Sequence, residues 1–541
     1  MEEEETWDEE LGVISRVALS SLGPLGSVQG VQANSKSTVL LSSGSRRLFE
    51  SLRWKSWYAR ALVRLTVQAQ VESFGDGGLL AAVVAASLVR AIRSNSRSPF
   101  DSFHMTQSLE SVLDYLRTKL KMDLTLELDG VGVVRPIQEL NWSDMESLVA
   151  LTRAVVSPKA KLGTTEVEVD HVCRTLAEAF VLSIPANTFE KPHVGLVTVT
   201  GPSTKETYRT SSVIVDIPIS CETERLLPIE SPSVAVFNTS LDVDMERNAV
   251  SENLSQYSGV SVETVDGALT SGEATMNFEL GLLSDVVSLL AAEGVSVVAC
   301  QKTIHPYIKQ ELVRRSIIPI ERVSRIHIDA VAACCGVQPV SALSRTTLGA
   351  LKSHIGTVKG IHLRRMKRKA VLNFEPAVDR SMQTVVLTAP NELVMEELAS
   401  SCRAVFELLA SALHSPYVVP GGGCIELILS MLIKSQIPAA GALSREERLT
   451  AKVLESFAST LASVARKVMG SRRVGGCAEQ ENAGEDHHHQ ESFARLWKTS
   501  RGLTSKQRGL LDLVLSKLGA IEYAVDAACN LARVDRTIVY Q

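Results

Sequence analysis

Several features that commonly signal a function are scarce in this sequence. Only 5% of its 541 residues are aromatic, so its cores must be built from Leu, Val, Ile and Ala. The nine cysteines include no CxxC pair, which disfavours a standard zinc site and favours reduced, mostly buried thiols. The 56 cationic and 61 acidic side chains leave a net charge of only −5, so the composition gives no reason to expect nucleic acid as a partner.

Targeting segments and hydrolytic motifs are also missing. The chain begins with Met1 followed by four glutamates, whereas a secretory signal needs a positive start and an apolar stretch. The most apolar run, after Asp76, meets Arg90 too early to span a bilayer, so we expect no membrane insertion. The sequence contains no Gly-x-Ser-x-Gly elbow, no His-Glu-x-x-His and no phosphate loop that ends in Gly-Lys-Ser/Thr.

The hydrophobic periodicity predicts a helical first third, a mixed α/β middle and a helical last third. Alternation and β-branched residues predict strands at Val194–Thr200 and Val295–Cys300. The second of these continues through a helix at Pro306–Arg315 to Ile317–Ile320, which is typical of a βαβ unit. Helices are expected at residues 9–21, 60–73, 79–92, 108–120, 145–156, 169–182, 393–413, 425–434, 445–469 and 509–532. We therefore predict a multidomain α and α/β fold in which both chain ends close one helical body around an insertion.

Two glycine-rich loops each precede a predicted helix. They are Gly75-Asp76-Gly77-Gly78 and Gly421-Gly422-Gly423. Glycine allows a close approach of the backbone to a ligand, and a helix N-terminus offers unpaired N–H groups to a phosphate. Asp76 is a candidate ligand for Mg²⁺ beside such a phosphate. Taken singly, each loop is better explained as a tight entry into a helix than as a ligand site.

Two further clusters leave more than one interpretation open. The run from Arg364 to Lys369 holds five cations and fits a nuclear address, a patch for acidic partners, or a solvated strand or hairpin face. Its lack of interleaved aromatic residues disfavours base stacking. His487-His488-His489 lies in a polar stretch, where a solvated loop competes with adventitious affinity for transition metals.

The order of these features resembles the group II chaperonin family. Ser21–Gly26 resembles the family's first phosphate loop, and Gly75-Asp76-Gly77 resembles its second. Val419–Glu426 is similar to its V-P-G-G-G-A-x-E, and Cys300-Gln301-Lys302 to the C-Q-K of its apical domain. Arg533-Val534-Asp535 resembles its terminal R-I-D-D. The five motifs occur in the family's order along nearly the whole chain.

The resemblance implies a chaperonin-like protomer with helical equatorial, small intermediate and α/β apical domains. The implied divisions are residues 1–138 and 419–541 for the equatorial domain, 139–211 and 374–418 for the intermediate domain, and 212–373 for the apical domain. The apical residues Ile304, Tyr307, Ile308 and Leu312 are implied to bind clients, and Ser258–Leu283 takes the place of the family's lid protrusion. Fewer residues precede the first helix than in the family, which implies poor formation of a standard ring.

Departures from the family pattern concern the chemistry of ATP hydrolysis. The family's catalytic aspartate falls on Ala404, and its Asn-Asp-Gly on Ser42-Ser43-Gly44. Gly78 and Leu79 replace two phosphate-binding threonines, and Leu25 replaces a lysine. The resemblance thus implies a degenerate ATPase that has no catalytic residue and no certain cofactor, with ATP and Mg²⁺ as the alternative. The implied remnant of a nucleotide site comprises Gly23, Pro24, Gly75, Asp76, Gly77, Gly78, Gly421, Gly422 and Gly423, with Asp76 as a weak metal ligand.

Within the family, Cys300–Gln310 and Arg225–Ile229 resemble the Bardet–Biedl chaperonin-like group most closely. That resemblance implies an assembly chaperone for the BBSome, a coat-like complex of ciliary membrane traffic. Its implied partners are other Bardet–Biedl chaperonin-like proteins and subunits of the cytosolic ring chaperonin. The implied location is the cytoplasm and the centrosome or basal body, with the nucleus as an addition. The alternatives are an ATP-hydrolysing ring foldase and a centrosomal scaffold without chaperone activity.

Overall fold

A computed structural model describes residues 2–23, 26–32, 39–120, 124–128, 132–157, 164–185, 192–217, 224–241, 271–341, 351–366, 369–377, 382–438, 443–470 and 509–534. The chain forms two compact units. Unit 1 holds residues 1–181, 200–207 and 387–541, and unit 2 holds residues 182–199 and 208–386. The two chain ends therefore belong to one body, as the sequence predicts. The finer three-domain division stays a prediction.

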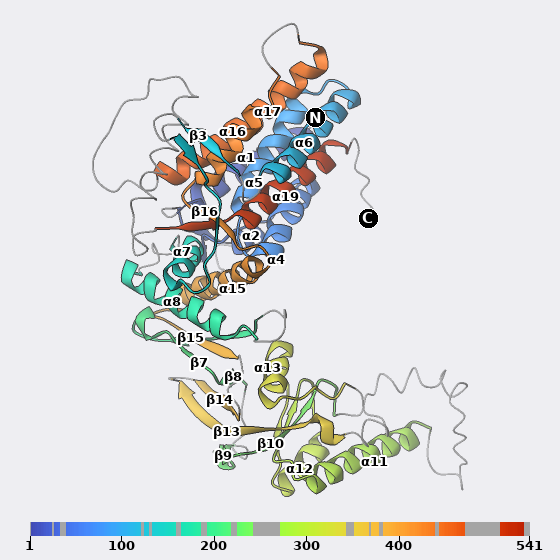
Figure 1. Cartoon of the computed structure of the whole chain (residues 1–541). Helices are drawn as coiled ribbons and strands as arrows, with labels where there is room; N and C mark the ends of the chain where they lie inside the picture. Colours follow the sequence, from blue (N-terminus) through green and yellow to red (C-terminus); the bar gives the residue numbers. More distant parts are fainter. Residues whose placement is uncertain are drawn as a thin grey trace. The chain divides into compact units, whose positions relative to one another are not determined.

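Unit 1 is helical and is built around α5 (Gly78–Asn95), which contacts α1 (Glu2–Ser21), α6 (Pro99–Lys119), α17 (Arg445–Gly470) and α19 (Val514–Ala532) (Figure 1). By length and composition α5 is apolar enough to cross a membrane, but 67% of it is buried inside this unit. A helix that is apolar almost all round must be covered by neighbours, and here other helices cover it. The remaining helices and strands of unit 1 are α2 (Ser45–Ser51), α3 (Trp57–Val63), a π-helical turn (Arg64–Gln68), α4 (Ala69–Phe74), α7 (Met145–Val156), α8 (Glu166–Leu182), α15 (Glu392–His414), α16 (Cys424–Lys434), β1 (Gln29–Val31), β2 (Leu40–Ser42), β3 (Leu126–Leu128), β4 (Gly132–Val134), β5 (Gln138–Glu139), β16 (Tyr417–Pro420) and β17 (Leu511–Leu513).

Unit 2 contains a seven-stranded mixed sheet in the order β12-β11-β10-β13-β14-β8, with β9 beside β13. These strands are β8 (Val213–Val215), β9 (Ile229–Glu230), β10 (Ser233–Phe237), β11 (Val297–Cys300), β12 (Ile318–Ile320), β13 (Ile355–Met366) and β14 (Lys369–Pro376). Strands β10, β11 and β12 are parallel, and α12 (Pro306–Arg314) connects β11 to β12. The predicted βαβ unit is thus confirmed.

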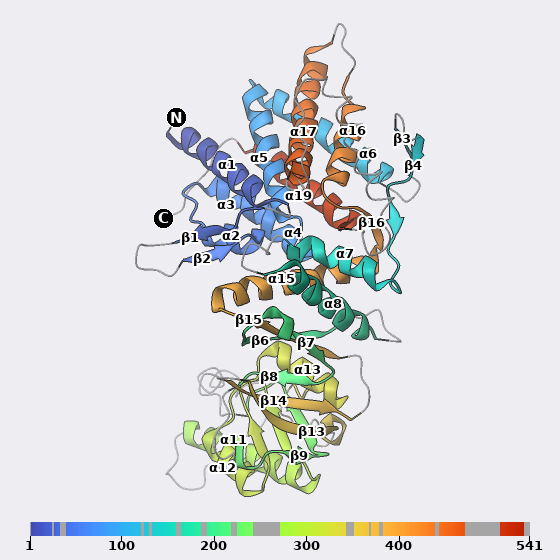
Figure 2. The same ribbon diagram turned by 90° about the vertical axis from the view of Figure 1, so that its left-hand side faces the viewer.

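Helices cover both faces of this sheet (Figure 2). Val234, Val297 and Ile318 face α13 (Arg325–Cys335), whereas Ala235 and Val298 face α11 (Ser271–Ala292) and α12. Successive residues of a strand point to opposite faces, so these strands are apolar throughout. A second sheet of three strands has the order β6-β15-β7, which are Val194–Thr200, Gln383–Ala389 and Tyr208–Thr210.

Most predicted helices occur, with corrections at their ends. The first helix begins at Glu2 rather than Glu9, and α6 begins at Pro99 rather than Ser108. Ser98 caps α6 by accepting a hydrogen bond from the Asp101 N–H, a start signal followed by a proline at the first position. The helix predicted from Gly509 starts at Val514, because residues 511–513 pair with β16 instead.

A capping box fixes the start of α8. The Glu168 carboxylate accepts hydrogen bonds from the Thr165 N–H at 2.8 Å and from the Ser203 hydroxyl at 2.6 Å. These hydrogen bonds, that from Ser203 foremost, lower the pKa of Glu168 from 4.5 to about 2. A carboxyl with a lowered pKa stabilises the fold above its unfolded pKa and loses that contribution as the pH falls through the folded pKa.

We therefore expect acid to destabilise the native chain between about pH 4.5 and pH 2 partly through Glu168. The Glu168→Gln variant lacks this titration, so its thermal midpoint should fall less steeply over that range. Circular dichroism melts from pH 7 down to pH 2 measure the difference. Glu166→Gln, on the exposed first turn of the same helix, is the matched control and should follow the wild-type profile.

Candidate functional site

The two glycine loops lie at one end of the helical core of unit 1. Gly75 ends α4 with φ +74°, and Gly77 opens α5 with φ +89°. Gly423 opens α16 with φ +97°. These left-handed conformations favour glycine over residues that carry a Cβ atom. The predicted role of both loops as helix entries is confirmed.

The start of α19 links the two loops. The Gln70 side-chain amide donates hydrogen bonds to the backbone oxygens of Asp76, at 2.7 Å, and Ser516, at 2.8 Å. The ammonium of Lys517 donates to Glu426, in the first turn of α16, at 2.9 Å. The structure thus connects Asp76 and Gly421–Gly423, which the resemblance places in one site, through the start of α19. The part that α19 plays in this connection was not suggested by the sequence.

The charges at this junction are largely buried. The Lys517 ammonium lies 2.9 Å from a Glu426 oxygen and 3.6 Å from an Asp512 oxygen, with side-chain exposures of 15%, 2% and 10%. Burial alone lowers the pKa of Lys517, but the carboxylates of Asp512, Glu426 and Asp76 outweigh it and raise that pKa. Burial raises the pKa of the Asp512 carboxyl. The second oxygen of Glu426 is buried and has no hydrogen-bond partner among the residues that the structure describes. The positive charge of Lys517 is therefore shared among three nearby acids, Asp512, Glu426 and Asp76.

Close packing accounts for two of the glycines of the second loop. A Cβ atom added at Gly75 would lie 2.3 Å from the Ala404 carbonyl oxygen of α15, which is backbone. At Gly77 it would lie 2.6 Å from the Gln70 amide nitrogen, which is already hydrogen-bonded to Asp76 and Ser516. The fold itself favours glycine at these two positions, whether or not a ligand binds. At Gly78 the nearest atom is the Ser45 hydroxyl oxygen, at 2.5 Å, which ends a short side chain, so packing alone does not require glycine there.

The backbone of α15 approaches the loop at Ala404, whose carbonyl oxygen faces Gly75. Ala404 is the residue that the resemblance implies takes the place of the family's aspartate. The nearest acid on the face of α15 that meets the loop is Glu407, whose Cβ would lie 2.8 Å from a Cβ at Gly75. With alanine at 404, and with Gly78 and Leu79 offering no hydroxyl, the residues present do not fit a catalytic site for Mg²⁺ and ATP.

A buried glutamate that the sequence did not single out connects α15 to the loop before α2. The carboxylate of Glu397 is fully buried and accepts hydrogen bonds from the Ser43 N–H at 2.9 Å, the Gly44 N–H at 3.0 Å and the Ser42 hydroxyl at 3.0 Å. Arg47 adds an ion pair at 3.3 Å. Ser42-Ser43-Gly44 thus binds a carboxylate of the chain itself. No sequence pattern revealed this, because the partners are more than 340 residues apart.

The first predicted loop forms a turn of its own. Gly23 has φ +83°, and its carbonyl accepts a hydrogen bond from the Gly26 N–H at 2.9 Å. The Ser27 N–H donates to the Ser20 carbonyl at 2.7 Å. Pro24 lies outside the described residues. The role of Gly23 and Pro24 in nucleotide binding stays a prediction.

The predicted client-binding residues do not share one surface. Ile304, Ile308 and Leu312 are 3%, 1% and 0% exposed and belong to the core between the sheet of unit 2 and its helices. Tyr307 is 51% exposed. The prediction is therefore corrected: α12 turns Ile308 and Leu312 inward, because its apolar stripe packs in the core that also holds Val298 and Cys300 of β11, and Ile304, just before the helix, is buried in the same core. The lid segment is described only from Ser271 onward, where α11 begins.

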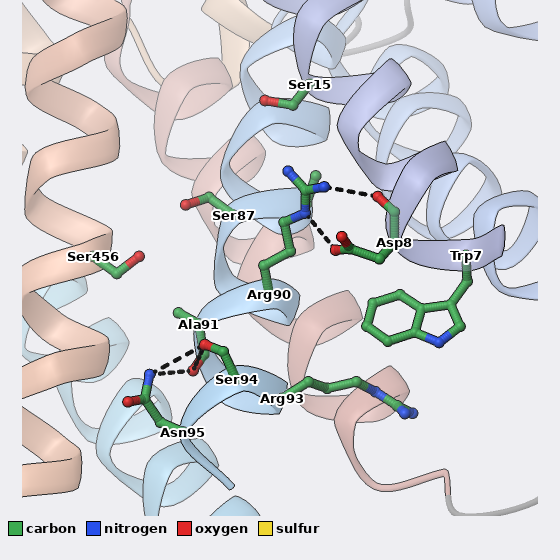
Figure 3. Close-up of a pocket in the computed structure, with 11 residues that line it drawn as sticks. Trp7, Asp8, Ser15, Ser87, Arg90, Ala91, Arg93, Ser94, Asn95 and Ser456 are labelled. Atoms are coloured by element: carbon green, nitrogen blue, oxygen red, sulfur yellow. Dashed lines mark hydrogen bonds and ion pairs between the residues drawn. The ribbon is translucent and has the colours of Figure 1, made fainter. Parts of the chain in front are cut away.

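A polar groove of about 730 Å³ lies between α1, α5 and α17 (Figure 3). The Arg90 guanidinium spans it and bonds to the carboxylate of Asp8 at 2.8 Å. Arg93 stacks on Trp7 with its guanidinium carbon 5.0 Å from the indole centroid. Serines fill much of the remaining wall, at Ser15, Ser87, Ser94 and Ser456. These contacts fasten α1 to the core helix, and the groove contains none of the predicted site residues.

Cysteine and metal chemistry find little support in the described residues. The seven described cysteines are free and buried, as expected for reduced thiols. Burial raises the pKa of Cys173 and of Cys402 to about 12. Among the described residues no cluster of His, Cys, Asp and Glu is arranged to hold a metal ion. His487-His488-His489 lies outside them.

Comparison with known proteins assigns the chain to a family. The model of the TCP-1/cpn60 chaperonin family matches residues 14–541. The protein named Molecular chaperone MKKS is 25% identical in Mus musculus, over 84% of this chain and 76% of the relative. Its human counterpart is 24% identical over 85% and 76%. Thermosome subunit 3 of Haloferax volcanii is 23% identical over 97% of this chain and 93% of its own.

Proposed function

The chain belongs to the TCP-1/cpn60 chaperonin family, and from that premise we propose that it is a chaperonin-like assembly chaperone that does not hydrolyse ATP. The observation that carries the proposal is Ala404. Its backbone contacts the Gly75 loop, at the position where the family's aspartate would act on the attacking water. An alanine side chain can neither orient nor deprotonate a water molecule.

The proposed client is the BBSome, because Cys300–Gln310 and Arg225–Ile229 resemble the Bardet–Biedl chaperonin-like group. The similarity to the relatives named Molecular chaperone MKKS supports a chaperone function. Other proteins of that group and subunits of the ring chaperonin are the proposed partners. The proposed place of action is the cytoplasm and the centrosome or basal body. The mechanism is binding of exposed apolar segments of the client without turnover, with Tyr307 as the accessible candidate on α12.

We expect the purified full chain to release no phosphate from ATP above the buffer background, and to retain BBSome subunits equally with and without ATP. The measurements are a phosphate-release assay and co-purification from the same sample. Asp76→Asn and Glu407→Gln test the two acids at the glycine loop, and neither substitution should alter the result. Ala404→Asp should not create turnover, because Gly78 and Leu79 lack the hydroxyls that the family uses.

Phosphate release that disappears in Asp76→Asn or Glu407→Gln would identify an ATPase and contradict the proposal. If nothing is hydrolysed, Tyr307→Ser separates the two remaining functions. A chaperone should lose client with this variant. A scaffold should keep its centrosomal location and never retain client.

A further inference from the structure

The basic run of the sequence begins in the last residues of β13 in unit 2, and its final residue, Lys369, is the first of β14. Strands β13 and β14 are antiparallel, with Arg364 opposite Val371 and Met366 opposite Lys369. We call Arg364 and Arg365, the two residues before the end of β13 at Met366, the basic tip. The sequence continues through Lys367, Arg368 and Lys369, so five cations occur within six residues of a chain whose net charge is −5. Such an asymmetry indicates a surface for an anionic partner.

The tip has a fixed base. Met366 and Val371 are 8% and 1% exposed and pack with Ile214, Val197 and Val386. The side chains of Arg364 and Arg365, which directly precede Met366, remain exposed and point to opposite faces of the strand. Residues 364–366 are thus held in a sheet, with Met366 in a core. The targeting interpretation of residues 364–369 stays a prediction, because Lys367 and Arg368 lie outside the described residues.

One arginine of the basic tip already binds a carboxylate of the chain itself. The guanidinium of Arg365 forms an ion pair with the carboxylate of Glu224. The arginine side chain is 77% exposed, so its remaining donors reach solvent. Arginine recognises carboxylates through parallel N–H donors, which gives geometry as well as attraction. The pair with Glu224 shows that a carboxylate can approach this surface without a steric clash.

We propose that the basic tip binds an acidic segment of a partner protein. Nucleic acid fits this surface less well, because single strands are held largely by stacking on aromatic rings. Tyr208 is the ring that the described tip contacts, and the guanidinium carbon of Arg364 already lies 5.0 Å from its centroid. The face of that ring is thus covered, and side chains with carboxylates remain the best match. The site is separate from the glycine loops and does not depend on the function proposed above.

The test is a titration of the full chain with a fluorescein-labelled peptide of about twelve residues that alternates Glu and Ser, followed by anisotropy. Arg364→Glu with Arg365→Glu should weaken binding at least about tenfold, because two attractions become repulsions. The neutral double variant Arg364→Gln with Arg365→Gln should weaken binding of the peptide less. This variant replaces the charge-reversed one in the test if the charge-reversed chain fails to fold. Raising the salt from about 0.05 M to about 0.3 M should weaken the wild-type complex and leave the reversed variant nearly unaffected.

The matched control reverses two other exposed cations of the same unit, Arg314 and Lys352, whose side chains are 71% and 84% exposed. Arg314→Glu with Lys352→Glu should change affinity by less than about twofold. If the control variant and the tip variant lose affinity for the peptide equally, the effect comes from the overall charge of the chain and the proposal is wrong. The proposal is also wrong if a peptide that alternates Gln and Ser binds as tightly as the acidic peptide. It is wrong as well if an oligouridine or anionic vesicles bind more tightly than the acidic peptide.

Discussion

Replacing Lys517 with methionine is expected to lower the free energy of unfolding by about 3–5 kcal/mol. The lysine is the cation shared by Glu426 and Asp512 at the start of α19, and its side chain is 15% exposed. Methionine keeps most of the volume but leaves two carboxylates buried without a counter-charge. Desolvated carboxylates that lose their partner cost more than the pair contributes, so the loss should be large. Urea unfolding followed by circular dichroism measures it.

Two companion variants test the cause. Lys452→Met removes a charge from the exposed face of α17 and should change stability by less than about 0.5 kcal/mol. Glu426→Gln combined with Lys517→Met removes one of the stranded charges and should recover part of the loss. If Lys517→Met proves no worse than Lys452→Met, the buried charge cluster does not hold α16 and α19 together.

Replacing Glu397 with alanine is expected to cost about 2–4 kcal/mol. The Ser43 and Gly44 N–H groups and the Ser42 hydroxyl all donate to its fully buried carboxylate, and each would lose its acceptor. Unfolding in urea gives the stability. Hydrogen exchange should show faster exchange at the amides of Ser43 and Gly44, because the contact between α15 and the loop before α2 is broken.

The neighbouring glutamate provides the control. Glu396 lies beside Glu397 on α15 and pairs with the same Arg47, but its side chain is 53% exposed. Glu396→Ala should cost less than about 1 kcal/mol, as is usual for an exposed ion pair. Similar losses in the two variants would mean that the carboxylate stabilises through surface charge rather than through its buried hydrogen bonds.

Local patterns predicted the elements well where one face is apolar. Met145–Val156 and Val194–Thr200 occur with the expected bounds, because hydrophobic periodicity and β-branched residues act within a single element. A strand or hairpin face was one interpretation of the run from Arg364 to Lys369, and the pairing of β13 with β14 supports it. The full length of these two strands and α13 were not predicted. The strand Ile355–Met366 shows no clean alternation along its length, because its register shifts between Val358 and Gly360 and it pairs with β10 at one end and with β14 at the other.

The candidate site was predictable only in part. A cluster of glycines before a helix is visible in the sequence, so Gly75–Gly78 and Gly421–Gly423 were predicted as loops. The structure brings these two loops together. Lys517 and Glu397 carry no local signal. Each acts through partners that are distant in sequence, and burial, not residue type, makes them important. The same reason explains the error at Ile304, Ile308 and Leu312, since an apolar stripe looks alike on a client surface and in a core.

The crowding around Gly75 and Gly77 has an evolutionary consequence. Natural selection for a stable protein is enough to preserve these two residues, because a larger residue would collide with Ala404 or Gln70. The two glycines would therefore persist in a chain of this fold with or without a reaction at the loop. The informative positions for such a reaction are those whose side chains the packing does not dictate.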